Sequence, residues 1–299
     1  MAEELKSHAD PRSTLRSIIV ICHRRTSHLE RVLGALASCT SIESFHVVFV
    51  VQDPIKPVLQ IIREFPYSHS ILTTDCSLSR STAQSINGNV FAGLEHCFNK
   101  LHSEFVIVLE DDIVLSKDAL KFYEFAINSQ SMFSGFRGVN GFSEMVAPVG
   151  ASKSFVRVSH GLGWGWAITE KTYSILRKFW TGKEDNHWDF IIEPYVRTGF
   201  VVNPIQSRVL NIGFDESATH TSGDSVLGES IQSSFSSNAP NYSELFEIID
   251  TDFFWQGKNI RFSLLSYLDM MKNWLIFLTF FIFKDSRFYH RVRHFLQSS

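Results

Sequence analysis

Three adjacent carboxylates, Glu110, Asp111 and Asp112, are the residues whose types and spacing most clearly suggest chemistry. They follow the apolar stretch "FVIVL" and precede Ile113 and Val114. Neighbouring carboxylates repel one another, and apolar surroundings strengthen this repulsion because the local dielectric is low. A hard cation such as Mg2+ or Mn2+ binds carboxylate oxygens, so it would relieve the repulsion and would also attract a diphosphate.

Two interpretations of the triplet compete: a cation site, or an ordinary solvated or helix-capping run. Adjacent residues at a strand end cannot all point one way, so at most two carboxylates can face one ligand. Ser116 is the natural N-cap of the helix expected from "KDALKFYEFAI", which leaves the triplet too early in the chain to be the cap. The apolar approach of residues 105–109 also argues against a purely solvated run. Metal binding is therefore the favoured interpretation.

Strands and helices alternate up to the triplet, and this alternation predicts how the carboxylates are positioned. Short apolar, β-branched runs typical of buried strands occupy residues 18–22, 45–53, 70–75 and 104–112. Apolar residues at helical spacing indicate helices at residues 26–39, 57–65 and 81–101. The order predicts an α/β fold of right-handed βαβ units, with a mostly parallel central sheet flanked by helices. Ligands of open α/β sheets bind at the carboxyl ends of strands, where the triplet stands.

The regular alternation of strands and helices ends after Lys121. The segments that follow are short and separated by glycines, and their apolar and polar residues partly alternate. We interpret the second half as a mixed extension of the sheet that builds a pocket over the first half. The chain then divides into a main domain at residues 14–223, a Ser-rich flexible loop or linker at 224–250, and a helical extension at 251–299.

The C-terminal extension contains an apolar block, Trp274 to Phe283, broken only by Thr279. The block is too short to span a bilayer, which needs about 20 apolar residues. Basic residues follow it, as expected at an anionic membrane surface: Lys284, Arg287, Arg291 and Arg293. Two interpretations stay open, a peripheral membrane contact through residues 263–296 or a C-terminal helix that packs on the main domain.

Composition excludes some partners and indicates a compartment. The net charge is -3 and charged residues make up 20% of the chain, which gives no electrostatic footprint for nucleic acid. The four cysteines lack zinc-site spacing and are interpreted as reduced core thiols: Cys22, Cys39, Cys76 and Cys97. The N-terminal stretch is polar and has no apolar signal region. We therefore expect a cytoplasmic protein, or one that is peripheral on the cytoplasmic face of a membrane.

An apolar strand that ends in an acidic triplet, with a helix behind it, resembles the metal-binding motif of nucleotide-sugar glycosyltransferases of the GT-A (Rossmann-like) fold. Other segments resemble parts of that fold in the same order: "IIVICHRRTSHLERVL", "VVFVVQD", "GLGWGWAI", "NHWDF" and "VLNIGFDESATHT". The chain is similar to the N-acetylglucosaminyltransferase family that initiates complex N-glycans and to its bacterial-type relatives. The resemblance covers roughly residues 16–223.

The resemblance implies a donor site on the first half of the chain. Arg24 and Asp53 would contact the nucleoside, whereas His23 and Arg25, which flank Arg24, are expected to be ordinary surface residues. Further residues would lie near the nucleotide-sugar: Asn87, Asn89, Asp111 and, in a supporting place, Glu110. Asp112 would hold Mn2+ (or Mg2+) against the diphosphate, with His220 as a second metal ligand.

The resemblance also implies an acceptor site with a catalytic base. Asp189 would deprotonate the acceptor hydroxyl, and desolvation by its apolar neighbours would raise its pKa and make it a better base. The alternative is an exposed Asp stabilised by a helix dipole. Four residues would bind the acceptor through close backbone approach and sugar stacking, unless they form a tight core turn: Gly163, Trp164, Trp166 and Trp188.

The function expected from this pattern is metal-dependent, inverting transfer of a sugar from a nucleoside diphosphate, UDP above others, to a hydroxyl of a glycan or lipid-linked acceptor. One alternative is a catalytically inactive relative that binds glycans or membranes. Another is a sugar-nucleotide pyrophosphorylase, which would need a Gly- and Lys-rich phosphate loop after the first strand, where "CHRRTS" is a poor match. A glycoside hydrolase that uses Glu110 and Asp189 as its two carboxylates is a further alternative. It would leave four residues without a role: Arg24, Asp53, Asp111 and Asp112.

Overall fold

A central nine-stranded sheet organises the chain, of which the computed structural model describes residues 15–75, 81–143, 155–159, 161–213 and 257–258. The strands of this sheet are β1 (Arg16–Cys22), β2 (Phe45–Gln52), β3 (His69–Thr74), β4 (Phe105–Glu110), β6 (Phe136–Asn140), β7 (Phe155–Val158), β8 (Trp166–Thr169), β9 (Phe200–Pro204) and β11 (Gly257–Lys258). A separate two-stranded ribbon consists of β5 (Ile113–Leu115) and β10 (Val209–Asn211). The helices are α1 (Thr26–Ala37), α2 (Lys56–Arg63), α3 (Thr82–Glu95), α4 (Ala119–Gln130), α5 (Glu170–Leu176) and α6 (Trp188–Val196), with a short 3-10 turn at Ile42–Ser44.

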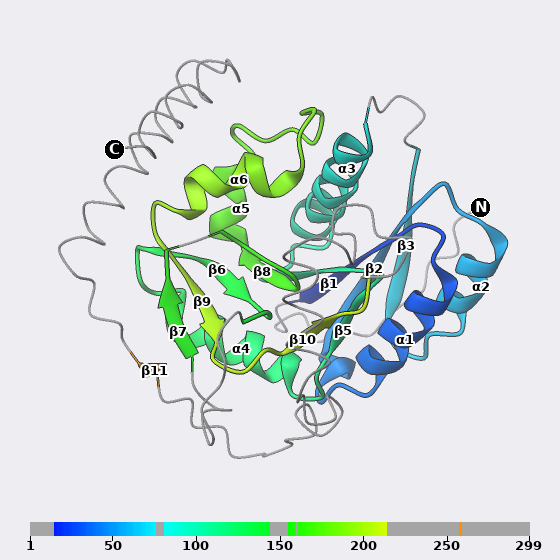
Figure 1. Ribbon diagram of the computed structural model, residues 1–299, viewed down its shortest axis with the longest axis horizontal. Coiled ribbons are helices and arrows are strands. Elements are labelled where there is room, and N and C mark those ends of the chain that lie inside the picture. Colours follow the sequence, from blue (N-terminus) through cyan, green and yellow to red (C-terminus); the bar gives the residue numbers. More distant parts are fainter. Residues whose placement is uncertain (1–14, 76–80, 144–154, 160, 214–256, 259–299) are drawn as a thin grey trace, which may run out of the picture.

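The strand order of the large sheet is β11-β7-β9-β6-β8-β4-β1-β2-β3 (Figure 1). The half that contains β3, β2, β1 and β4 is parallel, with Arg16 opposite Phe45 on β2 and opposite Phe105 on β4. The other half is mixed, because β8 runs antiparallel to β4 and β6, whereas β6 and β9 are parallel. The predicted mostly parallel sheet with a mixed extension is therefore confirmed.

Helices cover both faces of the sheet, as expected for strands that are apolar on both sides. Ile18 and Val20 of β1 belong to the core shared with α1, α2 and α4, whereas Ile19 and Ile21 belong to the core shared with α3, α5 and α6. Figure 1 shows α3, α5 and α6 together on one side of the sheet. Three of the predicted core thiols are buried and free: Cys22, Cys39 and Cys97.

Two predicted helices differ in their boundaries from the structure. Residues 81–101, predicted as one helix, form α3 and then a π-helical turn at His96–Lys100. The helix after the triplet begins at Ala119, and its N-cap is Asp118 rather than Ser116. The Ser116 hydroxyl instead donates a hydrogen bond to Asp118 Oδ1 (2.6 Å). The prediction that the acidic triplet does not cap this helix is therefore confirmed, although the cap is Asp118 and not Ser116.

Several predictions concern residues outside the described part of the chain: Cys76, His220, the linker at 224–250 and most of the extension at 251–299. Within that extension, Gly257–Lys258 pair in parallel with β7 as a strand, where a helix was predicted. Among the residues that the structure describes, no helix combines the length and the apolar character needed to cross a membrane.

Candidate active site

A pocket of about 1030 Å³ opens where β1, β2 and β4 end. These strands are parallel neighbours, so their carboxyl ends must lie together, which is the usual ligand position in such sheets. Gln52 ends β2 and Glu110 ends β4, and both line the pocket. The other walls come from the first turns of α3, residues 162–164, residues 185–190 and the segment that follows β10.

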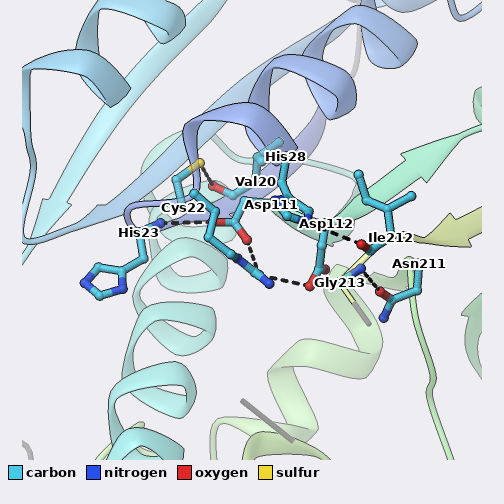
Figure 2. A network of polar contacts seen from close by, with 10 residues as sticks. Val20, Cys22, His23, His28, Asp111, Asp112, Asn211, Ile212 and Gly213 are labelled. Atoms are coloured by element: carbon cyan, nitrogen blue, oxygen red, sulfur yellow. Dashed lines mark hydrogen bonds and ion pairs between the residues drawn. The ribbon is translucent and has the colours of Figure 1, made fainter. Parts of the chain in front are cut away.

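A guanidinium holds the two aspartates of the triplet together. Asp111 and Asp112 are buried, with exposed fractions of 4% and 7%. Arg25, the residue before α1, contacts Asp111 Oδ1 and lies 2.9 Å from Asp112 Oδ2 through the same nitrogen, Nη2. The backbone N–H of His23 donates to Asp111 Oδ2 (3.3 Å; Figure 2). The expectation that Arg25 is an ordinary surface residue is therefore wrong, because the parallel pairing of β1 with β4 brings it to the triplet.

The charges of this cluster shift one another's pKa values. Burial raises the pKa of Asp112, and the attraction of Arg25 offsets this only in part. Burial lowers the pKa of Arg25, but the charges of Asp111 and Asp112 outweigh burial, and the net pKa is raised. Burial and the charge of Asp112 raise the pKa of Glu110 to about 7. The cluster therefore has an excess of negative charge that a further cation would neutralise.

The segment after β10 approaches Asp112 from another side. The N–H of Ile212 donates to the backbone oxygen of Asp112 (2.9 Å), next to the antiparallel pairing of β10 with β5. The N–H of Gly213 donates to Asn211 Oδ1 (2.7 Å), and Figure 2 shows Gly213 beside Asp112. A Cβ atom on Gly213 would lie 2.1 Å from Asp112 Oδ2. A side chain at this position would therefore collide with the carboxylate, and glycine avoids the collision.

Asp112 offers an oxygen that suits a hard cation. Within the described residues, Asp112 Oδ1 is buried and has no hydrogen-bond partner. Such a group normally has a ligand or water as its partner. The described part of the chain contains no cluster of three His, Cys, Asp or Glu side chains arranged for a metal. Mg2+ and Mn2+ nevertheless fit this donor set, because they commonly bind through one or two carboxylates and complete their coordination with water and phosphate oxygens.

Asp189 lines the same pocket from the first turn of α6. Its Oδ1 lies 2.7 Å from His187 Nδ1 and accepts a hydrogen bond from the N–H of Phe190 (2.8 Å). Burial alone would raise the pKa of Asp189, but the contact with His187 and the backbone N–H groups outweigh burial and lower the pKa. The prediction of a raised pKa is therefore wrong. Asp189 is an ionised carboxylate at neutral pH.

The sequence model of the family described as "Glycosyltransferase like family 2" matches residues 11–157, a segment that includes β1 to β6 and the acidic triplet. Just under half of the chain is therefore similar to this glycosyltransferase family. The match supports the predicted enzyme class and the GT-A fold, whereas a specific relation to the N-acetylglucosaminyltransferases stays a prediction. No curated protein sequence matches the chain.

Three solved structures are similar to the chain at low sequence identity. The first is TarS 1–349 of S. aureus, with 14% identity, a TM-score of 0.46, and coverage of 66% of this chain and 60% of that one. The same TarS fragment in complex with UDP has 13% identity and a TM-score of 0.46, and the match covers 66% of this chain and 60% of that one. The mannosyltransferase PcManGT of Pyrobaculum calidifontis, in complex with GDP-Man and Mn2+, has 12% identity and a TM-score of 0.42, and the match covers 67% of this chain and 59% of that one. The chain therefore spans about three fifths of each structure, and the likeness is too distant to indicate a substrate.

Some of the predicted acceptor residues line the pocket, and one belongs to the core. Gly163, Trp164 and Trp188 line the pocket. Trp166, on β8, is only 2% exposed and packs against Trp188, with ring centroids 4.7 Å apart. The assignment of Trp166 to the acceptor site is therefore corrected, because its ring belongs to the core. Phe190, which the sequence did not single out for this role, lines the pocket and is 52% exposed.

The predicted donor residues divide in the same way. Asn89 lines the pocket, accepts a hydrogen bond from the Thr74 hydroxyl (2.7 Å) and donates one to Gln52 Oε1 (2.8 Å). Arg24 is exposed and lies outside the pocket lining. Asp53 also lies outside the lining, just beyond β2 and with a φ of 44°. Gln52, which sequence reasoning missed, is the residue by which β2 reaches the pocket.

Asn87 supports the segment that leads to Asp189 and does not line the pocket. Its side chain is fully buried. Asn87 Oδ1 accepts a hydrogen bond from Trp180 Nε1 (2.6 Å), and Asn87 Nδ2 donates to the backbone oxygen and to Oε2 of Glu184 (both 3.2 Å). The prediction that Asn87 lies near the nucleotide-sugar is therefore corrected, because its polar atoms are used within the fold.

The substitution Asn87→Ala should destabilise the protein by about 2–3 kcal/mol, because the buried indole N–H of Trp180 would lose its acceptor. Equilibrium unfolding in urea measures this change. The matched control is Asn99→Ala, since Asn99 is only partly buried and donates to Glu95 one helical turn away (2.6 Å). We expect the control to lose less than about 1 kcal/mol. Equal losses in the two variants would contradict the structural role of Asn87.

Proposed function

We propose that the enzyme transfers a sugar from a nucleoside diphosphate, UDP in the first instance, to a hydroxyl of a glycan or lipid-linked acceptor, with inversion at the sugar carbon. One observation carries this proposal: a single pocket contains Asp112, whose Oδ1 suits a cation, and the ionised carboxylate of Asp189 on a different element. Glycosyl transfer needs both, because charge develops on the leaving diphosphate while the attacking hydroxyl loses a proton.

The donor side of the proposed reaction is built on the parallel half of the sheet. Asp112 would hold Mn2+ or Mg2+, with His220 proposed as a second ligand. The bound cation would supply Lewis-acid stabilisation of the leaving diphosphate. Asn89 and Gln52, which share a hydrogen bond at the pocket wall, offer amide groups to the nucleoside or ribose. Asp111, held by Arg25 and by the N–H of His23, would stand beside the donor sugar.

The acceptor side is built on α6 and on the segment before β8. Asp189 would take the proton of the attacking hydroxyl. His187 and Phe190 both contact Oδ1, so they orient the carboxylate, and Oδ2 is the oxygen we assign to the acceptor. Trp164 and Phe190 add aromatic surface to the pocket, which suits stacking against an acceptor sugar ring.

The first test is a calorimetric titration of the full chain with UDP, with and without Mn2+. We expect Mn2+ to tighten UDP binding by roughly tenfold or more, within the range typical of coupled sites. GDP in place of UDP tests the choice of base, and EDTA should abolish the effect of the metal. UDP binding that is identical with and without Mn2+ would overturn metal dependence.

A further inference from the structure

Arg25 places a positive charge between the two aspartates, next to the oxygen of Asp112 that suits a cation. A single guanidinium nitrogen contacts Asp111 Oδ1 and lies 2.9 Å from Asp112 Oδ2. Both carboxylates are buried, and burial of two adjacent negative charges is costly without a counter-charge. In the state that the structure describes, Arg25 provides this counter-charge. A divalent cation that approaches Asp112 therefore meets both a positive charge and an oxygen, Oδ2, that is already engaged.

Arg25 is placed to exchange partners. Its side chain keeps an exposed fraction of 25% and lines the pocket together with Asp111 and Asp112. A diphosphate in this pocket would offer the guanidinium new oxygen partners, and Arg binds phosphate as well as carboxylate through its planar fork. A metal on Asp112 and a diphosphate beside it would then compete with Arg25 for the carboxylates and attract it to the phosphate at the same time.

We propose that Arg25 is an internal counter-ion of Asp111 and Asp112 that weakens metal binding in the absence of donor and exchanges to the diphosphate when metal and donor bind together. This inference rests on the proposed metal-dependent function. The consequence is that metal binding and nucleotide binding are coupled. The cation binds weakly alone and more tightly when the nucleotide is present, so the two ligands tend to bind together. Coupling of this kind is reciprocal, because each ligand must strengthen the other by the same factor.

The test compares wild type and Arg25→Gln, with Mn2+ as the probe and free Mn2+ measured by electron paramagnetic resonance, first without nucleotide and then with saturating UDP. Without UDP, Arg25→Gln should bind Mn2+ about tenfold more tightly than wild type, and the strengthening by UDP should fall from roughly tenfold to less than about threefold. Arg31→Gln, which removes an exposed positive charge from α1, is the matched control and should leave Mn2+ binding unchanged.

A second variant protects the test against a failure of Arg25→Gln to fold. Arg25→Lys keeps the positive charge, but an ammonium is more strongly hydrated than a guanidinium and is therefore a weaker counter-ion for buried carboxylates, so the Mn2+ affinity of this variant should lie between those of the other two proteins. If Arg25→Gln and Arg25→Lys bind Mn2+ no more tightly than wild type, while UDP and Mn2+ still strengthen each other, the counter-ion role is overturned and the proposed function stands. If Mn2+ binds to none of the proteins even with UDP, metal dependence and the counter-ion role are both overturned.

Discussion

Asp189→Asn should reduce kcat by about 10²–10⁴-fold, the usual contribution of a general base, while the affinity for UDP and Mn2+ stays unchanged. The amide keeps the size of the carboxylate but cannot accept the proton of the acceptor hydroxyl. Because contacts with His187 and backbone N–H groups lower the pKa of Asp189, the wild-type base is ionised at neutral pH. As the pH falls from neutrality to about 3.9, the ordinary pKa of an aspartate, protonation of Asp189 should therefore not reduce the rate.

Steady-state kinetics and UDP titration of the same preparation provide the measurement. The control is Glu193→Gln on the same helix, since Glu193 pairs with Arg197 at i,i+4 spacing and lies outside the pocket lining. An i,i+4 pair on a helix typically contributes only about 0.3–0.5 kcal/mol, and Glu193 does not line the pocket, so the control should turn over at the wild-type rate. Full turnover by Asp189→Asn would show that another group accepts the proton.

Asp112→Asn should abolish the strengthening of UDP binding by Mn2+ and reduce kcat by about 10²–10³-fold, because the stabilisation that a metal gives to a leaving group amounts to several kcal/mol. The substitution should not lower the melting temperature. Burial raises the pKa of Asp112, so its charged form is disfavoured in the folded protein, and a neutral amide removes that cost. Activity and stability should thus change independently at this position.

Calorimetry with UDP and Mn2+, kinetics and thermal unfolding separate these effects. Glu30→Gln, an exposed carboxylate on α1, serves as the control for loss of one negative charge and should match wild type in all three measurements. If Mn2+ still strengthens UDP binding to the Asp112→Asn protein, residues other than Asp112 must hold the metal. A protein that merely unfolds would argue that the carboxylate has a structural role instead.

The sheet and the place of the triplet could be predicted because they depend on short-range patterns. The apolar run of β4 ends at Glu110, and the parallel order of the first strands follows from the alternation of strands and helices. The role of Arg25 could not be predicted in the same way. Its partner Asp111 is 86 residues away in the sequence, and their contact depends on β1 and β4 being neighbours, a feature of strand order that no local pattern encodes.

Other differences arise from which way individual side chains point. Asn87 and Asn89 are two positions apart on α3, so they cannot share a face, and only Asn89 reaches the pocket. Trp164 and Trp166 are also two positions apart, but β8 begins at Trp166, which is buried in the core, whereas Trp164 is only partly buried and lines the pocket. For Asp189, the apolar neighbours predicted burial, but its side chain is 44% exposed, and the contacts with His187 and with backbone N–H groups lower its pKa.

The hydrogen bonds that join α3 to residues 180–187 have a consequence for protein engineering. Besides the bonds of Asn87, the Ser81 hydroxyl donates to Asp185 Oδ1 and Gln84 Nε2 donates to the backbone oxygen of Lys183 (both 2.7 Å). A Cβ atom on Gly182 would lie 2.7 Å from the Cβ of Phe91 on the same helix. Exchanging this loop with that of a related protein, to redirect the proposed acceptor choice, should therefore succeed only when the matching residues 81–91 are transplanted with it.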